Sequence, residues 1–349
     1  MFDLLLSIAL MSVGWALRGS IGGGPLGAMI PGALWAMGMA WRRGWSGREA
    51  SFFVALAALG IGLGGQMTYG QTIGLFRDPN TRLWGLAGLS LKGAIWGLLG
   101  GVILSLAWLM PAKPLRLALL LLAATDIGWR WVNHPKLLYF SNPLDRPREE
   151  VWAGLLLSAL VLLLALRHPL TGRFALLGLT GGALGFGGGA FFNLVPLTGF
   201  PGWKMMEFTF GAILGGALHF AVPPATPKDS PSPSWQHALF YPLWCAVIIA
   251  VGLHLPVRYA YSAVVAISIV LLSAFPQTGW LLAFGATLAA ACLDLHQTHP
   301  LWAILLGSLP VSLVFCWQRA SRCLPRDAAW LLLACCAWIY CLEYFPVFR

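Results

Sequence analysis

Two charged residues stand three positions apart at the start of an apolar run. In "PGWKMMEFTFGAILGG", Lys204 and Glu207 share one face of a helix and are close enough to pair. Far upstream, "LSLKGAIWGLLGG" places Lys92 well inside another apolar run. A lysine at the centre of a membrane helix costs about 2.5 to 3.5 kcal/mol. These charges are therefore candidates for a functional role or for pairing with an internal partner.

A second pair of charges follows a repeated Gly-Trp dipeptide. Asp126 and Arg130 lie one helical turn apart in "TDIGWRWVNHP", which aligns with "MSVGWALRG" and its Arg18. If two such units pack together, the two arginines and two lysines converge, with Glu207 and Asp126 as counter-ions. A converging cationic site favours an anionic ligand such as a carboxylate or a phosphate. The alternative is that these residues are unrelated anchors at the membrane interface.

Hydrogen-bonding side chains gather in "GGQMTYGQTIG", which holds Gln66, Thr68, Tyr69, Gln71 and Thr72. A polar cavity lining and the capping of a helix end both explain such a cluster. Its counterpart, "GGGAFFNLVP", keeps only Asn193. The predicted substrate-binding residues are Arg18, Gln66, Gln71, Lys92, Asp126, Arg130, Asn193, Lys204 and Glu207.

The elements that position these residues are predicted to be membrane helices. The 349 residues are 58% hydrophobic and 10% charged, with a mean hydropathy of +0.76. Most apolar segments run for about 17 to 25 residues, the length a helix needs to cross a bilayer. Continuous apolar runs exclude the alternating pattern of a membrane barrel. We expect an all-α, polytopic transmembrane bundle of about 12 to 13 spans.

The expected spans are separated by short loops rich in Gly, Pro and charge. The Gly- and Pro-rich stretch "GSIGGGPLGAMIPG" also allows the first two spans to form a broken or re-entrant pair. The predicted spans are 2–18, 24–41, 51–75, 84–110, 115–131, 151–167, 173–197, 203–222, 237–254, 259–275, 279–295, 301–318 and 328–345.

The first eight segments resemble a tandem duplication. Gly14-Trp15 recurs as Gly128-Trp129, Gly64-Gly65 as Gly188-Gly189, and the Gly93-Ala94-Ile95-x-Gly97 pattern recurs from Gly211. Four segments per unit predict parallel repeats, related by an axis along the membrane normal. The expected division is a first repeat (1–114), a second repeat (115–222), a hydrophilic connector (223–236) and a five-helix region (237–349).

Small residues recur at every fourth position in several segments. They fall at 24, 28, 32, 36 and 40, again at 93, 97 and 101, and again at 181, 185 and 189. Such faces let membrane helices approach closely. They predict a tightly packed bundle and also allow a homo-oligomer.

Other chemistry finds little support in the sequence. The seven cysteines form no CxxC pair, and "CLDLHQTHP" is interpreted as a solvated span end, so no metal and no cofactor are expected. The net charge of +10 is scattered in loops without the basic stripe that nucleic-acid binding requires. The expected partners are the lipid bilayer and a small-molecule or lipid-linked substrate.

Three functions remain open on the sequence alone. The first is a transporter or channel for a small solute, with an anion as one candidate, and with its site between the two repeats. The second is an integral membrane enzyme acting on a lipid-linked or phosphate-bearing substrate, with Asp126 or Glu207 as acid and base. The third is a non-catalytic scaffold subunit, whose charges would point outward. The expected location is a bacterial inner membrane, crossed many times.

Overall fold

The computed structural model describes residues 1–21, 24–109, 112–141, 149–195, 201–227, 257–274 and 325–344. Over these ranges the chain is helical and forms no strand, which confirms the all-α prediction. The elements are α1 (Phe2–Ile21), α2 (Gly24–Arg42), α3 (Gly47–Gly64), α4 (Gly70–Arg77), α5 (Arg82–Leu109), α6 (Pro114–Gly128), the π-helical turn η1 (Trp129–Asn133), α7 (Trp152–Leu166), α8 (Pro169–Gly189), the 3-10 turn η2 (Ala190–Leu194), α9 (Gly202–Ala221), α11 (Val257–Ala274) and α14 (Pro325–Tyr344).

Local sequence explains where several helices begin. Ser46 caps α3 in a capping box, because its side chain accepts from the Glu49 amide and the Glu49 carboxylate accepts from the Ser46 amide. Pro114 and Pro169 occupy the first turn of α6 and α8, where a missing N–H costs no helical hydrogen bond.

The predicted span 51–75 is divided in the structure. Helix α3 ends at Gly64, the chain turns through residues 65–69, and the short α4 begins at Gly70. Two consecutive glycines at 64 and 65 favour a helix end, because glycine gains little from staying helical. The division places Gln66, Thr68 and Tyr69 in a non-helical corner between two helices, and Gln71 and Thr72 in the first turn of α4.

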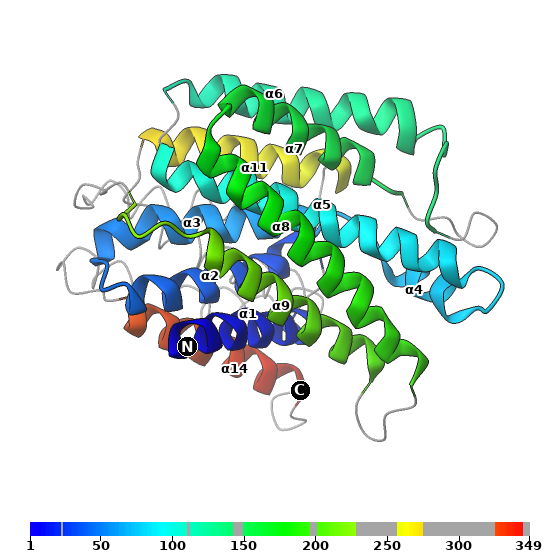
Figure 1. The fold of residues 1–349 in the computed structure, drawn as a ribbon, viewed down its shortest axis with the longest axis horizontal. Helices are drawn as coiled ribbons and strands as arrows, with labels where there is room; N and C mark the ends of the chain where they lie inside the picture. Colours follow the sequence, from blue (N-terminus) through cyan, green and yellow to red (C-terminus); the bar gives the residue numbers. More distant parts are fainter. Residues whose placement is uncertain are drawn as a thin grey trace.

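Six helices form a closed ring among the described residues: α1 packs on α2, α2 on α3, α3 on α5, α5 on α8, α8 on α9, and α9 returns to α1. Figure 1 shows α6, α7 and α11 on one side of this ring, with α11 against α6 and α7 beside α5. Helix α14 packs on α2 at the opposite side. The ring encloses the residues that the sequence singled out on α1, α5 and α9.

Glycines make the joint between α5 and α8. A Cβ at any of three α5 glycines would overlap a main-chain carbonyl oxygen of α8; these pairs are Gly93 with Gly182, Gly97 with Gly178, and Gly101 with Phe174. The predicted face on α5 is thus confirmed as a packing surface, where two backbones meet without side chains between them.

Helix α8 carries a second glycine face toward α9. A Cβ at Gly181 would press on Ala217, one at Gly185 on Phe210, and one at Gly189 on Met206. Helix α8 therefore approaches both of its ring neighbours through glycine, while the side chains of Leu176 and Leu184 stay exposed.

Three helices are long and apolar enough to cross a membrane, judged by length and composition over the described residues. They cover Phe2–Gly19, Arg82–Leu109 and Pro169–Leu194. The predicted count of 12 to 13 spans stays a prediction. The predicted spans 237–254, 279–295 and 301–318 lie outside the described residues, as does most of the connector.

The packing of the described helices does not establish the predicted repeat. Some contacts inside the two units correspond, since α1 packs on α2 as α6 does on α7, and α3 packs on α5 as α8 does on α9; however, α2 packs extensively on α3, whereas α7 and α8 barely touch. Contacts between the units do not correspond: α1 lies against α9, whereas α6 and α5 make no comparable contact among the described residues. The repeat, with its domain boundaries, stays a prediction.

Candidate functional site

Aromatic rings from four helices fill the interior of the ring. Trp15 of α1 meets Trp96 of α5 edge to face, with ring centroids 4.8 Å apart. Phe210 of α9 lies 4.7 Å from Trp15, and Phe186 of α8 lies 4.9 Å from Phe210. Because α1 and α5 are not neighbours in the ring of six helices, the contact between Trp15 and Trp96 crosses the interior of that helix ring.

A buried arginine, tyrosine and glutamate lie directly beside this aromatic cluster. Arg18 Nη1 donates to Glu207 Oε1 at 3.0 Å and also to the Tyr69 hydroxyl. The Tyr69 hydroxyl in turn donates to Glu207 Oε1 at 2.9 Å. The side chains of Arg18 and Glu207 are 6% and 1% exposed. The three residues, here called the Arg18 triad, come from α1, the 65–69 corner and α9.

Aromatic faces surround the guanidinium of the triad. Arg18 Cζ lies 5.6 Å from the ring centroid of Trp15, 5.4 Å from that of Tyr69 and 5.9 Å from that of Trp96. The negative faces of aromatic rings attract a cation, and the attraction grows when water is excluded. The aromatic rings, together with the Glu207 carboxylate, therefore stabilise the positive charge of Arg18 away from solvent.

A second cation and a glycine complete the surroundings of the triad. Lys204 Nζ donates to the carbonyl oxygen of Ala16 at 2.9 Å and lies 4.5 Å from the ring centroid of Trp203. A Cβ at Gly19 would overlap Glu207 Oε2, so the carboxylate fits against α1 only because residue 19 has no side chain. With Arg18 and Lys204 against Glu207, these three ionised groups carry one excess positive charge.

Three buried polar atoms around the triad have no hydrogen-bond partner among the described residues. They are Trp15 Nε1, Arg18 Nε and Glu207 Oε2. Buried polar groups are normally paired, and leaving one unpaired costs about 1 to 3 kcal/mol. The unpartnered donors and acceptor are the strongest sign of a ligand site in the described part of the chain.

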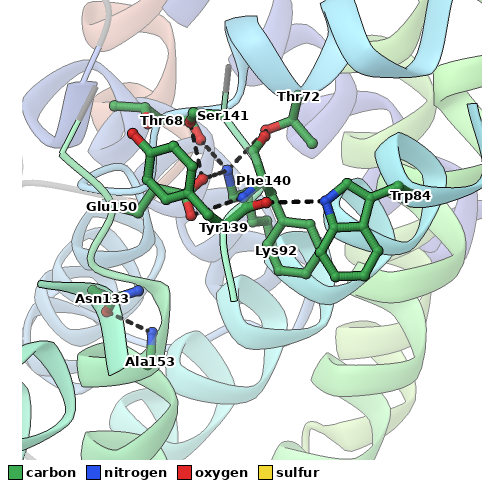
Figure 2. A network of polar contacts seen from close by, with 10 residues as sticks. All are labelled: Thr68, Thr72, Trp84, Lys92, Asn133, Tyr139, Phe140, Ser141, Glu150 and Ala153. Atoms are coloured by element: carbon green, nitrogen blue, oxygen red, sulfur yellow. Dashed lines mark hydrogen bonds and ion pairs between the residues drawn. The ribbon is translucent and has the colours of Figure 1, made fainter. Parts of the chain in front are cut away.

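Lys92 forms a separate network in which all three N–H donors of its ammonium group make a hydrogen bond (Figure 2). Its Nζ donates to Glu150 Oε1 at 2.7 Å, to the Thr68 carbonyl oxygen at 2.7 Å and to Thr72 Oγ1 at 2.8 Å. An ammonium group has three donors, so none remains for a ligand. Both side chains of the Lys92–Glu150 pair are 1% exposed.

Both carboxylate oxygens of Glu150 accept hydrogen bonds, just as all three donors of Lys92 make them. Its Oε1 accepts from Ser141 Oγ at 3.0 Å and its Oε2 accepts from the Phe140 amide at 3.1 Å. The ring of Phe140 stacks on Trp84, with centroids 4.7 Å apart. The Lys92 network thus attaches the segment before α7 to the body of α5.

The Lys92 network and the Arg18 triad are joined through two consecutive residues, Thr68 and Tyr69. Lys92 binds the carbonyl oxygen of Thr68, and the next residue, Tyr69, places its hydroxyl in the Arg18 triad. The sequence hypothesis of convergence on one cationic centre therefore takes a different form here: Arg18, Lys204 and Glu207 lie together, and Lys92 has its own carboxylate.

The remaining predicted residues lie outside the triad. Arg130 Nε donates to Asp126 on the same helix at 2.7 Å, and its side chain is 63% exposed. Gln66 is buried and donates to Ser262 of α11 at 3.1 Å. Asn193 accepts from Arg77 at 3.2 Å, and Gln71 lies in the first turn of α4.

Two ionisable residues of these networks, Tyr69 and Glu150, were absent from the predicted set. Tyr69 belongs to the polar cluster noted in the sequence, but no pattern indicates which of its side chains turns inward. Glu150 follows a long loop of mixed charge and aromatic residues, which hides a buried carboxylate from any helical periodicity. Among the described residues, no three His, Cys, Asp or Glu side chains group as metal ligands.

The chain matches no known protein family, no curated protein and no solved structure.

Proposed function

We propose that the protein is an integral membrane transporter for a small organic anion that binds at the Arg18 triad. The observation that carries the proposal is the meeting of Arg18, Tyr69 and Glu207 inside a ring of apolar helices, beside polar atoms without a partner. Ionisable groups inside membrane helices are expensive and generally mark pathways for solutes or ions.

The charge of the site supports an anion. Arg18 and Lys204 outnumber Glu207 by one charge, and Arg18 Nε and Trp15 Nε1 offer two unpartnered N–H donors. A carboxylate accepts hydrogen bonds from such donors and neutralises the excess charge. Arg18 and Tyr69 belong to the first predicted repeat and Lys204 and Glu207 to the second, so the site lies where the two units meet.

The packing of the interior favours a carrier over an open channel. The rings of Trp15, Trp96, Phe186 and Phe210 occupy the space beside the triad. Passage of a solute then requires these side chains or their helices to move, as alternating access provides.

Neither alternative gains support from a specific contact. An enzyme with Glu207 as acid or base needs that carboxylate near a lateral opening, but it is buried against α1. A scaffold with outward-pointing charges does not account for the burial of Arg18, Lys92 and Glu207.

Uptake into proteoliposomes tests the proposed function. The full chain is reconstituted, and radiolabelled L-lactate, propionate, L-alanine and inorganic phosphate are offered in turn. We expect uptake of at least one of the three carboxylates, of which L-lactate and propionate are anions and L-alanine is a zwitterion, above that of protein-free vesicles. Arg18→Gln should lower this uptake at least about tenfold, because a lost charge-assisted hydrogen bond costs about 1.5 to 3 kcal/mol.

The control for this experiment is Asp3→Asn, which removes an ion pair with Arg42 at the far end of the same helix. Its uptake should equal that of the unmodified protein. Absence of uptake for every solute, or full uptake by a folded Arg18→Gln variant, would reject the proposed function.

A further inference from the structure

We infer that the solute bound at the Arg18 triad carries an O–H or N–H donor beside its anionic group, as an α-hydroxy or α-amino acid does. This inference rests on the proposed function and narrows it. It follows from the kind of polar atom left without a partner at the triad, where both donors and an acceptor are found.

The unpartnered atoms belong to one small region. Arg18 Nε is in the same guanidinium as Nη1, and Glu207 Oε2 is in the same carboxylate as Oε1, and Nη1 and Oε1 are 3.0 Å apart. The Trp15 ring lies 5.6 Å from Arg18 Cζ. Two donors and one acceptor are thus presented around a single ion-pair contact.

The Lys92 network shows that this protein can saturate a buried ion pair. There the lysine uses three donors, and the two carboxylate oxygens of Glu150 accept from Lys92, Ser141 and Phe140. At the Arg18 triad, by contrast, Glu207 Oε1 accepts two hydrogen bonds while Oε2 accepts none among the described residues. The difference distinguishes a binding site from a structural ion pair.

The chemistry of a matching ligand follows from these atoms. A carboxylate group would accept from Arg18 Nε and Trp15 Nε1. A plain carboxylate would then leave Glu207 Oε2 buried, unpaired and close to another negative charge. A hydroxyl or ammonium group on the neighbouring carbon would donate to Oε2 and remove both penalties. A site built to bond such a group rejects the analogue that lacks it.

Three solutes of equal carbon number test the inference. Propionate, L-lactate and L-alanine differ only in a hydrogen, a hydroxyl or an ammonium group at the second carbon. Their dissociation constants are measured by titration calorimetry on the full chain in lipid nanodiscs. We expect L-lactate or L-alanine to bind at least about tenfold more tightly than propionate, the factor that corresponds to one satisfied buried group.

Variants at Glu207 identify the atom responsible. In Glu207→Gln the amide oxygen takes the place of Oε1, which accepts from Arg18 and Tyr69, so the amide nitrogen, a donor, takes the place of Oε2. The preference over propionate should then fall to less than about threefold. Glu207→Asp keeps a carboxylate and should retain a preference, and Asp3→Asn should leave the ratio unchanged. Thermal unfolding of each variant confirms that it is folded before binding is compared.

The outcomes separate this inference from the proposed function. Equal binding of the three solutes, together with uptake of propionate, overturns the inference and leaves the transporter intact. A preference that survives in folded Glu207→Gln also overturns it, because the discriminating atom would lie elsewhere. If none of the three solutes binds and no solute in the panel is taken up, both proposals fail, and the unpartnered atoms are satisfied by water only.

Discussion

Replacing Lys92 with methionine is expected to lower the free energy of unfolding by about 3 to 5 kcal/mol. The substitution leaves the Glu150 carboxylate buried without its cation, and an uncompensated buried charge is among the most costly defects in a protein. Glu150→Gln should cost a similar amount, because it leaves the ammonium of Lys92 unpaired. Denaturant titration in detergent micelles, followed by tryptophan fluorescence, measures both.

The double variant Lys92→Met/Glu150→Gln gives this prediction its sharpest form. Removing both charges together should cost less than the sum of the single variants, since neither ion is then left alone. Asp3→Asn, which breaks an exposed pair with Arg42, should change stability by less than about 1 kcal/mol. Additive costs in the double variant would show that the two side chains do not act as a pair.

The second large effect is expected at a glycine of α8. Gly178→Ala should destabilise the fold by about 1 to 3 kcal/mol, because its Cβ would overlap the carbonyl oxygen of Gly97 and a backbone cannot move aside as a side chain can. The effect should appear as a lower midpoint of thermal unfolding in detergent.

A glycine on the same helix provides the matched control. Gly188 is exposed, and a Cβ there would meet no atom within 4 Å, so Gly188→Ala should change stability by less than about 1 kcal/mol. Equal losses for the two substitutions would show that helix flexibility, and not the close approach of α5 and α8, makes glycine necessary at residue 178.

The sequence predicted most helices well because apolar length and breaker residues are local signals. The predicted 24–41, 84–110 and 203–222 differ from α2, α5 and α9 by at most a few residues. Spacing by four residues also identified the glycine faces, since the helical period fixes which positions share a side. Which helix each face meets depends on tertiary packing, and the glycine face of α8 toward α5, at residues 178 and 182, was not foreseen.

The candidate site was predictable only in outline. The cost of burying Arg18, Lys92 and Glu207 singled them out, and this reasoning needs no tertiary structure. Their partners could not be derived in the same way: Arg18 and Glu207 are 189 positions apart, and Glu150 reaches Lys92 through a loop without periodicity. The expected convergence of Arg18, Arg130, Lys92 and Lys204 assumed a symmetric association that the contacts between units do not reproduce.

The Thr68-Tyr69 peptide links the position of Tyr69 in the Arg18 triad to the position of Thr68 in the Lys92 network. The carbonyl oxygen of Thr68 accepts from Lys92, which anchors the segment before α7. The hydroxyl of Tyr69 bonds with Arg18 of α1 and Glu207 of α9. A solute that drew Tyr69 away from Glu207 would therefore pull on the same short stretch of main chain that Lys92 holds. The Thr68-Tyr69 peptide therefore couples the Arg18 triad to the Lys92 network, because a displacement at one end of so short a segment moves the other end.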